Sequence, residues 1–253
     1  MQDHFTKENA EDRGLIFGRN AVLEVIRSGR EVDRVYITKG SVTGSLVPII
    51  EKCRAKKIPI KEVPAQKLDF MSGGATHQGI IASVAAKSYC SLNELIETAT
   101  ANGKSGFFIL CDGLEDPHNL GAIIRTAEAT GVDGIIIPKH RSVSLNATVA
   151  KSASGALEYV NVCKVTNLPN TIDTLKEAGF WIYGADMDGQ NWFEPDFKGH
   201  TAIVIGSEGN GIGRLVKDKC DAIISMPMSG KINSLNASVA AGVLMYEVAR
   251  QRL

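Results

Sequence analysis

Short apolar runs that alternate between helical and extended spacing characterise the first third of the chain. Residues 21–28 have the apolar spacing of a helix, with Asn20 at the N-cap position and Gly29 directly after the last helical residue. The other elements predicted in this part are a helix over residues 46–56 and strands over residues 34–38, 58–60 and 80–84. Together they predict a small αβ unit.

Strands and helices are predicted to alternate regularly in the rest of the chain. Ser91-Leu-Asn-Glu94 fits a capping box that opens a helix up to Thr100, and the apolar run over residues 107–111 is continuous, as in a buried parallel strand. Further strands are predicted at residues 135–137, 159–165, 181–184, 202–205 and 222–225, and helices at residues 120–130, 171–178 and 235–252, the last with an apolar stripe that includes Val239 and Leu244. This alternation favours a mainly parallel α/β sheet with helices on both faces, whose ligands lie at the carboxyl ends of the strands.

The composition is that of an ordinary globular protein. Of the 253 residues, 44% are hydrophobic and 22% are charged, and no apolar run approaches the length of a membrane span. Five cysteines, an odd number without a CxxC spacing, argue against a disulfide framework and against a zinc site, so no metal is expected. Reduced thiols and an acidic N-terminus without an apolar leader segment predict a cytoplasmic protein without a membrane partner.

The neutral net charge conceals an asymmetry between the two parts. Residues 13–88 carry 13 Lys and Arg against 6 Asp and Glu, whereas residues 89–253 carry 14 against 18. A basic unit favours a polyanionic partner such as RNA, although a lysine-rich surface without a partner explains the charge equally well. The predicted domains are an acidic tail (1–12), a basic domain (13–88), a linker (89–104) and a larger α/β domain (105–253).

Three loops that follow predicted strands are rich in Gly, Asn, Ser and charged residues. They span residues 112–121, 205–213 and 225–238. Each also has a purely structural explanation, because Asn119 and Ser234 suit helix caps and Arg125 suits a surface ion pair with Glu128. The glycines after Ile205 do not fit a GxGxxG fingerprint, and Walker A, HExxH and GxSxG signatures are absent from the sequence. A dehydrogenase or a nucleotide hydrolase is therefore unsupported.

The same three loops nevertheless carry a family resemblance. Asn119-Leu-Gly-Ala-Ile-Ile-Arg125, Ile205-Gly-Ser-Glu-Gly209 and Ser234-Leu-Asn-Ala-Ser-Val-Ala240 resemble the three motifs of the SpoU (TrmH-type) branch of the SPOUT RNA methyltransferases, in that family's order. Residues 13–88, with Phe17-Gly-Arg-Asn20 and His77-Gln-Gly79, resemble the L30e-like RNA-binding domain of some members. The combination is most similar to the bacterial members that methylate the ribose 2′-hydroxyl of a guanosine in large-subunit (23S) ribosomal RNA.

The resemblance implies a fold, a cofactor and a set of site residues. The fold is an α/β sheet with a C-terminal trefoil knot that binds S-adenosylmethionine, and members act as homodimers. The family's cofactor contacts fall on Gly206, Met226 and Leu235, its catalytic residues on Asn119, Arg125, Glu208, Ser234 and Asn236, and the RNA contacts of the added domain on Arg19, His77 and Gln78.

The chemistry of these residue types restricts their roles. A guanidinium stays protonated, so we expect Arg125 to bind a phosphate and stabilise developing alkoxide charge rather than act as the base. Glu208 is expected to orient Arg125 or Asn119. Two alternatives remain open at this point, namely methylation of transfer RNA and a non-catalytic role in RNA binding or ribosome assembly.

Overall fold

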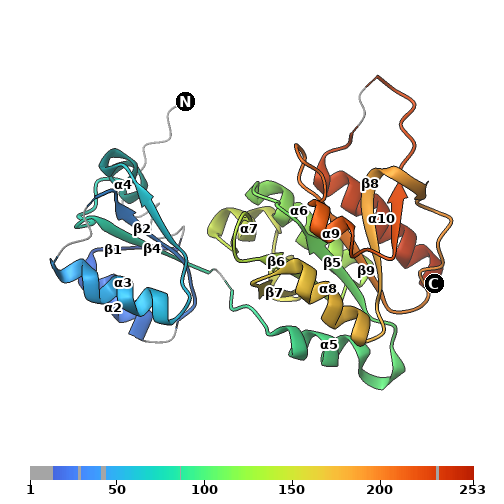
Figure 1. Ribbon diagram of the computed structural model, residues 1–253, viewed down its shortest axis with the longest axis horizontal. Coiled ribbons are helices and arrows are strands. Elements are labelled where there is room, and N and C mark those ends of the chain that lie inside the picture. Colours follow the sequence, from blue (N-terminus) through green and yellow to red (C-terminus); the bar gives the residue numbers. More distant parts are fainter. Residues whose placement is uncertain (1–13, 28–29, 41–43, 86, 232–233) are drawn as a thin grey trace. The chain divides into compact units, whose positions relative to one another are not determined.

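The computed structural model describes residues 14–27, 30–40, 44–85, 87–231 and 234–253 (Figure 1). Two compact units divide the chain: the described residues up to Ser88 together with Ser144–Thr148 form the first, and the remainder forms the second. The predicted acidic tail and the helix stop at Gly29 lie outside the described residues.

The first unit is built on a mixed four-stranded sheet in the order β1-β4-β2-β3. Its strands are β1 (Leu15–Phe17), β2 (Val32–Thr38), β3 (Ile60–Val63) and β4 (Ile80–Val84), and its helices are α2 (Arg19–Arg27), the 3-10 turn η1 (Gly44–Leu46), α3 (Val47–Ala55) and α4 (Ala65–Ser72). Alternation along β2 sends Val35 and Ile37 into the core beneath α2 and α3, whereas Tyr36 packs with Leu68 of α4. The predicted αβ organisation is thus present, while β1 and α4 had no clear pattern in the sequence.

The start of α2 differs from the prediction. Asn20 was expected to cap this helix, but the helix begins one residue earlier, at Arg19, and Asn20 lies inside it. Gly18 adopts a left-handed φ of +87° and its carbonyl oxygen accepts the hydrogen bond from the Val22 amide. The amide of Arg19 donates to Gln78 Oε1 at 2.9 Å, so a side chain 59 positions away caps the helix.

The second unit is built on a six-stranded sheet in the order β10-β8-β9-β5-β6-β7, with every pairing parallel. The strands are β5 (Phe107–Cys111), β6 (Gly134–Pro138), β7 (Asn161–Val165), β8 (Trp181–Asn191), β9 (Thr201–Ile205) and β10 (Ala222–Ser225). The helices are α5 (Leu92–Thr100), α6 (Pro117–Thr130), α7 (Ala147–Ser152), α8 (Leu168–Glu177), α9 (Arg214–Lys217) and α10 (Ala237–Arg252), with short 3-10 turns η2 (Ala101–Gly103) and η3 (Ala156–Glu158). The predicted mainly parallel α/β fold is confirmed.

Helices cover both faces of this sheet. Leu95 of α5 and Ile172 of α8 pack in one core cluster with Phe108 and Leu110 of β5. Helices α6 and α10 pack against one another, and α10 also contacts β9. The capping box at Ser91 is present, so the segment predicted as a linker contains a helix that packs in the core of the second unit.

Two helices that border the strand ends begin at residues other than those predicted. Asp116, not Asn119, caps α6: its Oδ1 accepts from the His118 amide, Pro117 occupies the first helical position, and Asn119 lies buried in the first turn. Asn236, not Ser234, caps α10, because its Oδ1 accepts from the amides of Ser238 and Val239. Because other residues cap the two helices, the side chains of Asn119 and Ser234 remain available for contacts elsewhere.

The apolar surface of α10 is wider than the stripe that packs in the core. Leu244 and Val248 are buried as predicted, whereas Val239 is 51% exposed and Tyr246 is 59% exposed. Of the predicted apolar stripe, Leu244 thus packs in the core while Val239 lies at the surface, so the helix shows apolar residues on more than one side.

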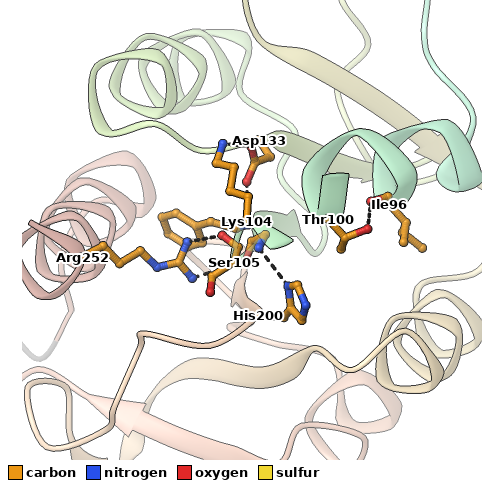
Figure 2. A network of polar contacts seen from close by, with 9 residues as sticks. Ile96, Thr100, Lys104, Ser105, Asp133, His200 and Arg252 are labelled. Carbon is orange, nitrogen blue, oxygen red and sulfur yellow. Dashed lines mark hydrogen bonds and ion pairs between the residues drawn. The ribbon is translucent and has the colours of Figure 1, made fainter. Parts of the chain in front are cut away.

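A polar network fixes the C-terminus of α10 at the amino ends of β5 and β9 (Figure 2). The Arg252 guanidinium donates to the carbonyl oxygens of Ser105 (2.8 Å), Gly106 (3.3 Å), Phe197 (2.9 Å) and Gly199 (2.7 Å). Burial lowers the pKa of Arg252. The guanidinium of Arg252 thus binds the backbone carbonyls of the two loops that precede β5 and β9. This network lies at the end of the sheet opposite to the three polar loops.

Candidate functional site

Two cavities lie at the carboxyl ends of the parallel strands in the second unit. The smaller, of about 360 Å³, is lined by the ends of β8, β9 and β10 and by the start of α10. The larger, of about 830 Å³, is lined by the loops after β5 and β6 and by the starts of α6, α8 and α9. Residues 207–211 line both, so the loop after β9 separates them. This is the position where the chain order reverses across the sheet, between β9 and β5, as expected for ligand sites in open parallel sheets.

A closed hydrogen-bonded triad lies at this shared wall. Asn119 Nδ2 donates to Glu208 Oε1 at 2.9 Å, and Asn236 Nδ2 donates both to Asn119 Oδ1 at 2.9 Å and to Glu208 Oε1 at 2.5 Å. Each residue comes from a different polar loop. The structure therefore brings together three of the five predicted catalytic residues, although up to 117 positions separate them in the sequence.

The first turn of α10 sets the orientation of Asn236 in the triad. Asn236 Oδ1 is engaged by the first turn of α10, so its Nδ2 must face Asn119 and Glu208. Asn119 is 5% exposed, whereas Glu208 is exposed. One carboxylate oxygen, Glu208 Oε1, receives both amide donors, which leaves Oε2 for a group in either cavity.

Close packing explains why glycine occupies position 206. A Cβ atom there would lie 2.2 Å from the carbonyl carbon of Gly211. The loop folds back on itself through paired backbone hydrogen bonds between Ser207 and Gly211, of 2.9 and 3.1 Å, so no side chain fits beneath it. Gly206 thereby shapes the floor of the smaller cavity.

The smaller cavity contains all three residues predicted to contact a cofactor. Gly206, Met226 and Leu235 line it, together with Ser234. Its walls are mostly apolar, with backbone amides and carbonyls of the glycine-rich loop at one side. Such a cavity suits a partly apolar ligand of about this volume whose polar edges are read by the backbone.

Arg125 is not part of this constellation. It is exposed on α6, six residues after Asn119, which places it about 240° around the helix axis from that residue. Its guanidinium lies 3.5 Å from Ser154 Oγ, and in the part of the chain that the structure describes it forms no ion pair with Glu128, contrary to the structural alternative. A single copy of the chain does not direct Arg125 toward Glu208.

The predicted RNA contacts meet in the first unit. Arg19 Nε donates to the carbonyl oxygen of Gln78 at 3.1 Å and its Nη1 to Ser45 Oγ at 2.7 Å, at a cavity of about 720 Å³. Gln78 itself has a left-handed φ of +51°, which is uncommon for a residue with a side chain. His77 stays close by, with Nε2 2.9 Å from Asp69 Oδ1 and Nδ1 accepting from the Gly79 amide. Arg19, His77 and Gln78 thus form one local cluster.

Two aspartates at the cavities were not identified from the sequence. Asp112 Oδ2 accepts from the Gly213 amide at 2.7 Å and so ties the loop after β5 to the start of α9. Asp186 lines the smaller cavity and accepts from Lys217 Nζ at 2.7 Å. Burial disfavours ionisation of Asp186, but the bonds from Lys217 and from the Met187 amide together outweigh it and lower its pKa. The available signal was their position in the sequence: Asp112 directly follows the predicted strand 107–111, and Asp186 lies two residues after the predicted strand 181–184.

A metal-binding cluster and a membrane-spanning helix are both absent from the described residues. No group of three or more His, Cys, Asp or Glu side chains there is arranged to hold a metal ion. Likewise, none of the helices described is long and apolar enough to cross a membrane.

Comparison with known proteins gave consistent matches along most of the chain. Residues 106–246 match the model of the SpoU rRNA Methylase family, and residues 15–90 match that of the RNA 2′-O ribose methyltransferase substrate binding domain. YacO of Bacillus subtilis (strain 168), named for the TrmH family of tRNA/rRNA methyltransferases, is 47% identical over 244 residues, which cover 96% of this chain and 98% of that protein.

Solved structures share the fold. The SpoU methyltransferase AviRb from Streptomyces viridochromogenes, in complex with AdoMet, superposes with a TM-score of 0.59 at 23% identity and covers 94% of this chain and 90% of its own. An AdoMet-bound rRNA methyltransferase from Sinorhizobium meliloti superposes with a TM-score of 0.60 at 20% identity. The match covers 98% of this chain and 92% of that protein's chain. A TrmH/SpoU tRNA modifying enzyme from A. aeolicus superposes with a TM-score of 0.54 at 28% identity. The match covers 64% of this chain and 82% of that protein's chain.

Proposed function

The chain belongs to the SpoU rRNA methylase family of RNA methyltransferases, and on that basis we propose that it transfers a methyl group from S-adenosylmethionine to the ribose 2′-hydroxyl of a guanosine in large-subunit (23S) ribosomal RNA. The observation that carries the proposal is the wall shared by two cavities, with Asn119, Glu208 and Asn236 bonded together in it. A transferase needs two ligands that meet at one place, and this arrangement supplies it.

The smaller cavity fits S-adenosylmethionine. Its apolar walls, including Met226 and Leu235, suit the adenine ring, and the backbone of residues 206–211 offers amides and carbonyls for the polar edges. When bound, this cofactor supplies an electrophilic methyl group. The residues that would hold it come from the segments that the family threads into a trefoil knot, and the proposal includes that knot.

The larger cavity then receives the target nucleotide. Glu208 faces both cavities, and the two asparagine amides fix its carboxylate. We assign the triad the role of orienting the ribose beside the cofactor, with Ser234 as a further polar group at the smaller cavity. Positioning of this kind supplies much of the acceleration in a transfer between two bound groups.

Arg125 enters the proposal through a homodimer. Gly242 of α10 lies next to Thr126 of α6, so exposed Val239 and Tyr246 border the helix that carries Arg125. Pairing of two copies through this apolar surface would bury it and direct Arg125 of one copy to the triad of the other. There its planar guanidinium would bind an RNA phosphate and stabilise the developing alkoxide, while another group accepts the proton.

A subunit-mixing experiment tests that role. Arg125→Ala and Asn236→Ala are each expected to be inactive, and mixing them after dissociation is expected to restore about a quarter of the wild-type activity, since half of the dimers are mixed and each has one complete site. No recovery in a mixture shown to contain mixed dimers would place Arg125 and Asn236 in the same copy's site. Replacement of Arg125 by Lys tests whether the planar, two-pronged guanidinium is required. Near-normal turnover with unchanged RNA affinity would show that a single positive charge is sufficient.

The basic first unit is proposed to bind the RNA substrate. It carries the excess of Lys and Arg, and Arg19 and Gln78 line one cavity, with His77 next to Gln78 in the chain. We expect the affinity for RNA to fall steeply as salt concentration rises, because phosphate contacts release counterions. An RNA affinity that survives deletion of residues 1–88 would contradict this division of labour.

The decisive experiment is to map ribose methylation across ribosomal RNA from cells with and without the gene. We expect one guanosine of the large-subunit RNA to lose its 2′-O-methyl group in the deletion strain and to regain it when purified protein and S-adenosylmethionine are added. Methyl incorporation into unmodified transfer RNA instead would establish the alternative target. Binding of RNA without transfer to either would support a non-catalytic role.

A further inference from the structure

Asp186 is a second charged residue of the smaller cavity, located in β8 directly after Ala185, the last residue of that strand paired with β9. Its side chain is 17% exposed and lines the cavity next to Met187. Two donors hold the carboxylate: the amide of Met187 donates to Oδ1 at 2.7 Å, and Lys217 Nζ donates to Oδ2 at 2.7 Å. The side chain is therefore fixed before any ligand arrives.

The Asp186 carboxylate retains one unused hydrogen-bond acceptor position on each of its two oxygens. Each oxygen has one bond from the protein, so each keeps a lone pair for another donor. Glu208, the other carboxylate that lines this cavity, already receives two amide donors on one oxygen as part of the triad. Asp186 is thus the carboxylate that can accept two hydrogen bonds side by side.

The neighbouring charge decides which donor fits. Lys217 places a cation at hydrogen-bond distance from Asp186, and a second ammonium at the same carboxylate would be repelled by it. A pair of neutral hydroxyl groups meets no such repulsion and matches two adjacent acceptor oxygens. Carboxylates accept from ribose hydroxyls in the same manner in other nucleotide sites.

We propose that Asp186, held in place by Lys217, is the acceptor for the ribose 2′,3′-diol of the bound cofactor. The inference rests on the proposed function, because it assumes an adenosyl ligand in the smaller cavity. It assigns Asp186 to ligand binding and Lys217 to its positioning.

The test is a thermodynamic cycle between protein and ligand, measured by calorimetry on the full chain. The ligands are S-adenosylhomocysteine, 5′-methylthioadenosine and 2′-deoxy-5′-methylthioadenosine. In the wild type, removal of the 2′-hydroxyl should weaken binding about tenfold or more, as for a hydrogen bond to a charged group. Asp186→Ala should weaken S-adenosylhomocysteine and 5′-methylthioadenosine by more than this factor, because both bonds to the diol are lost. It should weaken the deoxy ligand by a smaller factor, because only the bond to the 3′-hydroxyl is left to lose.

Controls separate this role from general effects. Asp188→Asn removes a charge from an exposed position of the same strand and should leave all three affinities within about twofold. Asp186→Asn retains the shape of the side chain and serves as the variant least expected to misfold. It should weaken the same ligands as Asp186→Ala does, but by smaller factors. Lys217→Met should weaken both ribose ligands less than Asp186→Ala does.

Several outcomes overturn the inference. A loss for S-adenosylhomocysteine without a loss for 5′-methylthioadenosine would assign Asp186 to the amino-acid ammonium. An equal effect of 2′-deoxygenation in the wild type and in Asp186→Ala would place the diol elsewhere, and unchanged affinities in that variant would remove Asp186 from the site. If the wild type binds none of the ligands, the proposed function itself fails.

Discussion

Replacement of Asn119 by Asp offers the sharpest test of the triad. The change keeps the size of the side chain but replaces the Nδ2 donor by an acceptor oxygen that faces Glu208 Oε1 at 2.9 Å. Two carboxylates at that distance repel one another by about 6 kcal/mol at an effective dielectric constant of 20 and by about 1.4 kcal/mol in bulk water. Since Asn119 is 5% exposed and Glu208 is exposed, we expect an intermediate destabilisation of about 3 kcal/mol at pH 7.5.

The pH dependence identifies the cause. Repulsion raises the folded-state pKa of the new carboxyl at position 119 above its unfolded value, so the folded protein retains a proton that the unfolded chain releases. Below the unfolded pKa both states are protonated and the penalty is absent. It should appear as pH rises through the unfolded value and reach its full size above the raised folded value.

Urea unfolding between pH 4 and pH 8 measures this effect, with S-adenosylhomocysteine affinity as a second readout. Asn119→Ala should lower stability by a similar amount at every pH, because it removes the bonds without adding charge. The double variant Asn119→Asp/Glu208→Gln should recover most of the stability, since an amide donor again faces an acceptor. A pH-independent loss in Asn119→Asp, or no recovery in the double variant, would refute the geometry of the triad.

Three further predictions concern the loop, the C-terminus and the thiols. Gly206→Ala should abolish binding of S-adenosylhomocysteine in calorimetry because its Cβ would collide with the backbone of Gly211, whereas Gly199→Ala, at a position with open space outside both cavities, should bind normally. Arg252→Leu should lower the free energy of unfolding by about 2–4 kcal/mol, measured in urea, because four carbonyl oxygens lose their donor, and Arg252→Lys should recover only part of that loss. Burial raises the pKa of Cys53 to about 11 and that of Cys111 to about 12, so iodoacetamide at pH 8 should label them only under unfolding conditions, as followed by mass spectrometry; rapid labelling of the native protein would contradict the buried positions.

Local patterns in the sequence determined the architecture of this protein. The continuous apolar run of β5 and the regular alternation that follows it predicted a parallel sheet with helices on both faces, and the capping box at Ser91 predicted α5. These signals are readable because burial of a strand on two faces, or satisfaction of amides at a helix start, requires particular residue types within a few positions of one another. The three polar loops were likewise visible, since strand ends in such sheets carry the ligand sites.

Only the tertiary structure decided which residue caps each helix and which side chains meet. Asn119 and Ser234 were expected to cap helices, but Asp116 and Asn236 do so, because several polar residues near a helix start compete for the same amides. The cap of α2 comes from Gln78, across 59 positions. Such choices depend on which distant group arrives at the same place, and no local pattern contains that information.

The site shows the same division. Motif resemblance pointed to Asn119, Glu208 and Asn236, yet their closed triad exists because β9 lies beside β5 and α10 packs against α6 and contacts β9. Asp186 was not identified, since a lone aspartate in the second half of a strand has no distinctive sequence pattern until Lys217 is brought beside it. The sequence by itself determined the elements and the chemistry of the loops, whereas the register of the sheet and the packing of its helices decided their partners, because hydrogen bonds and charge pairs act over a few ångströms of space regardless of separation along the chain.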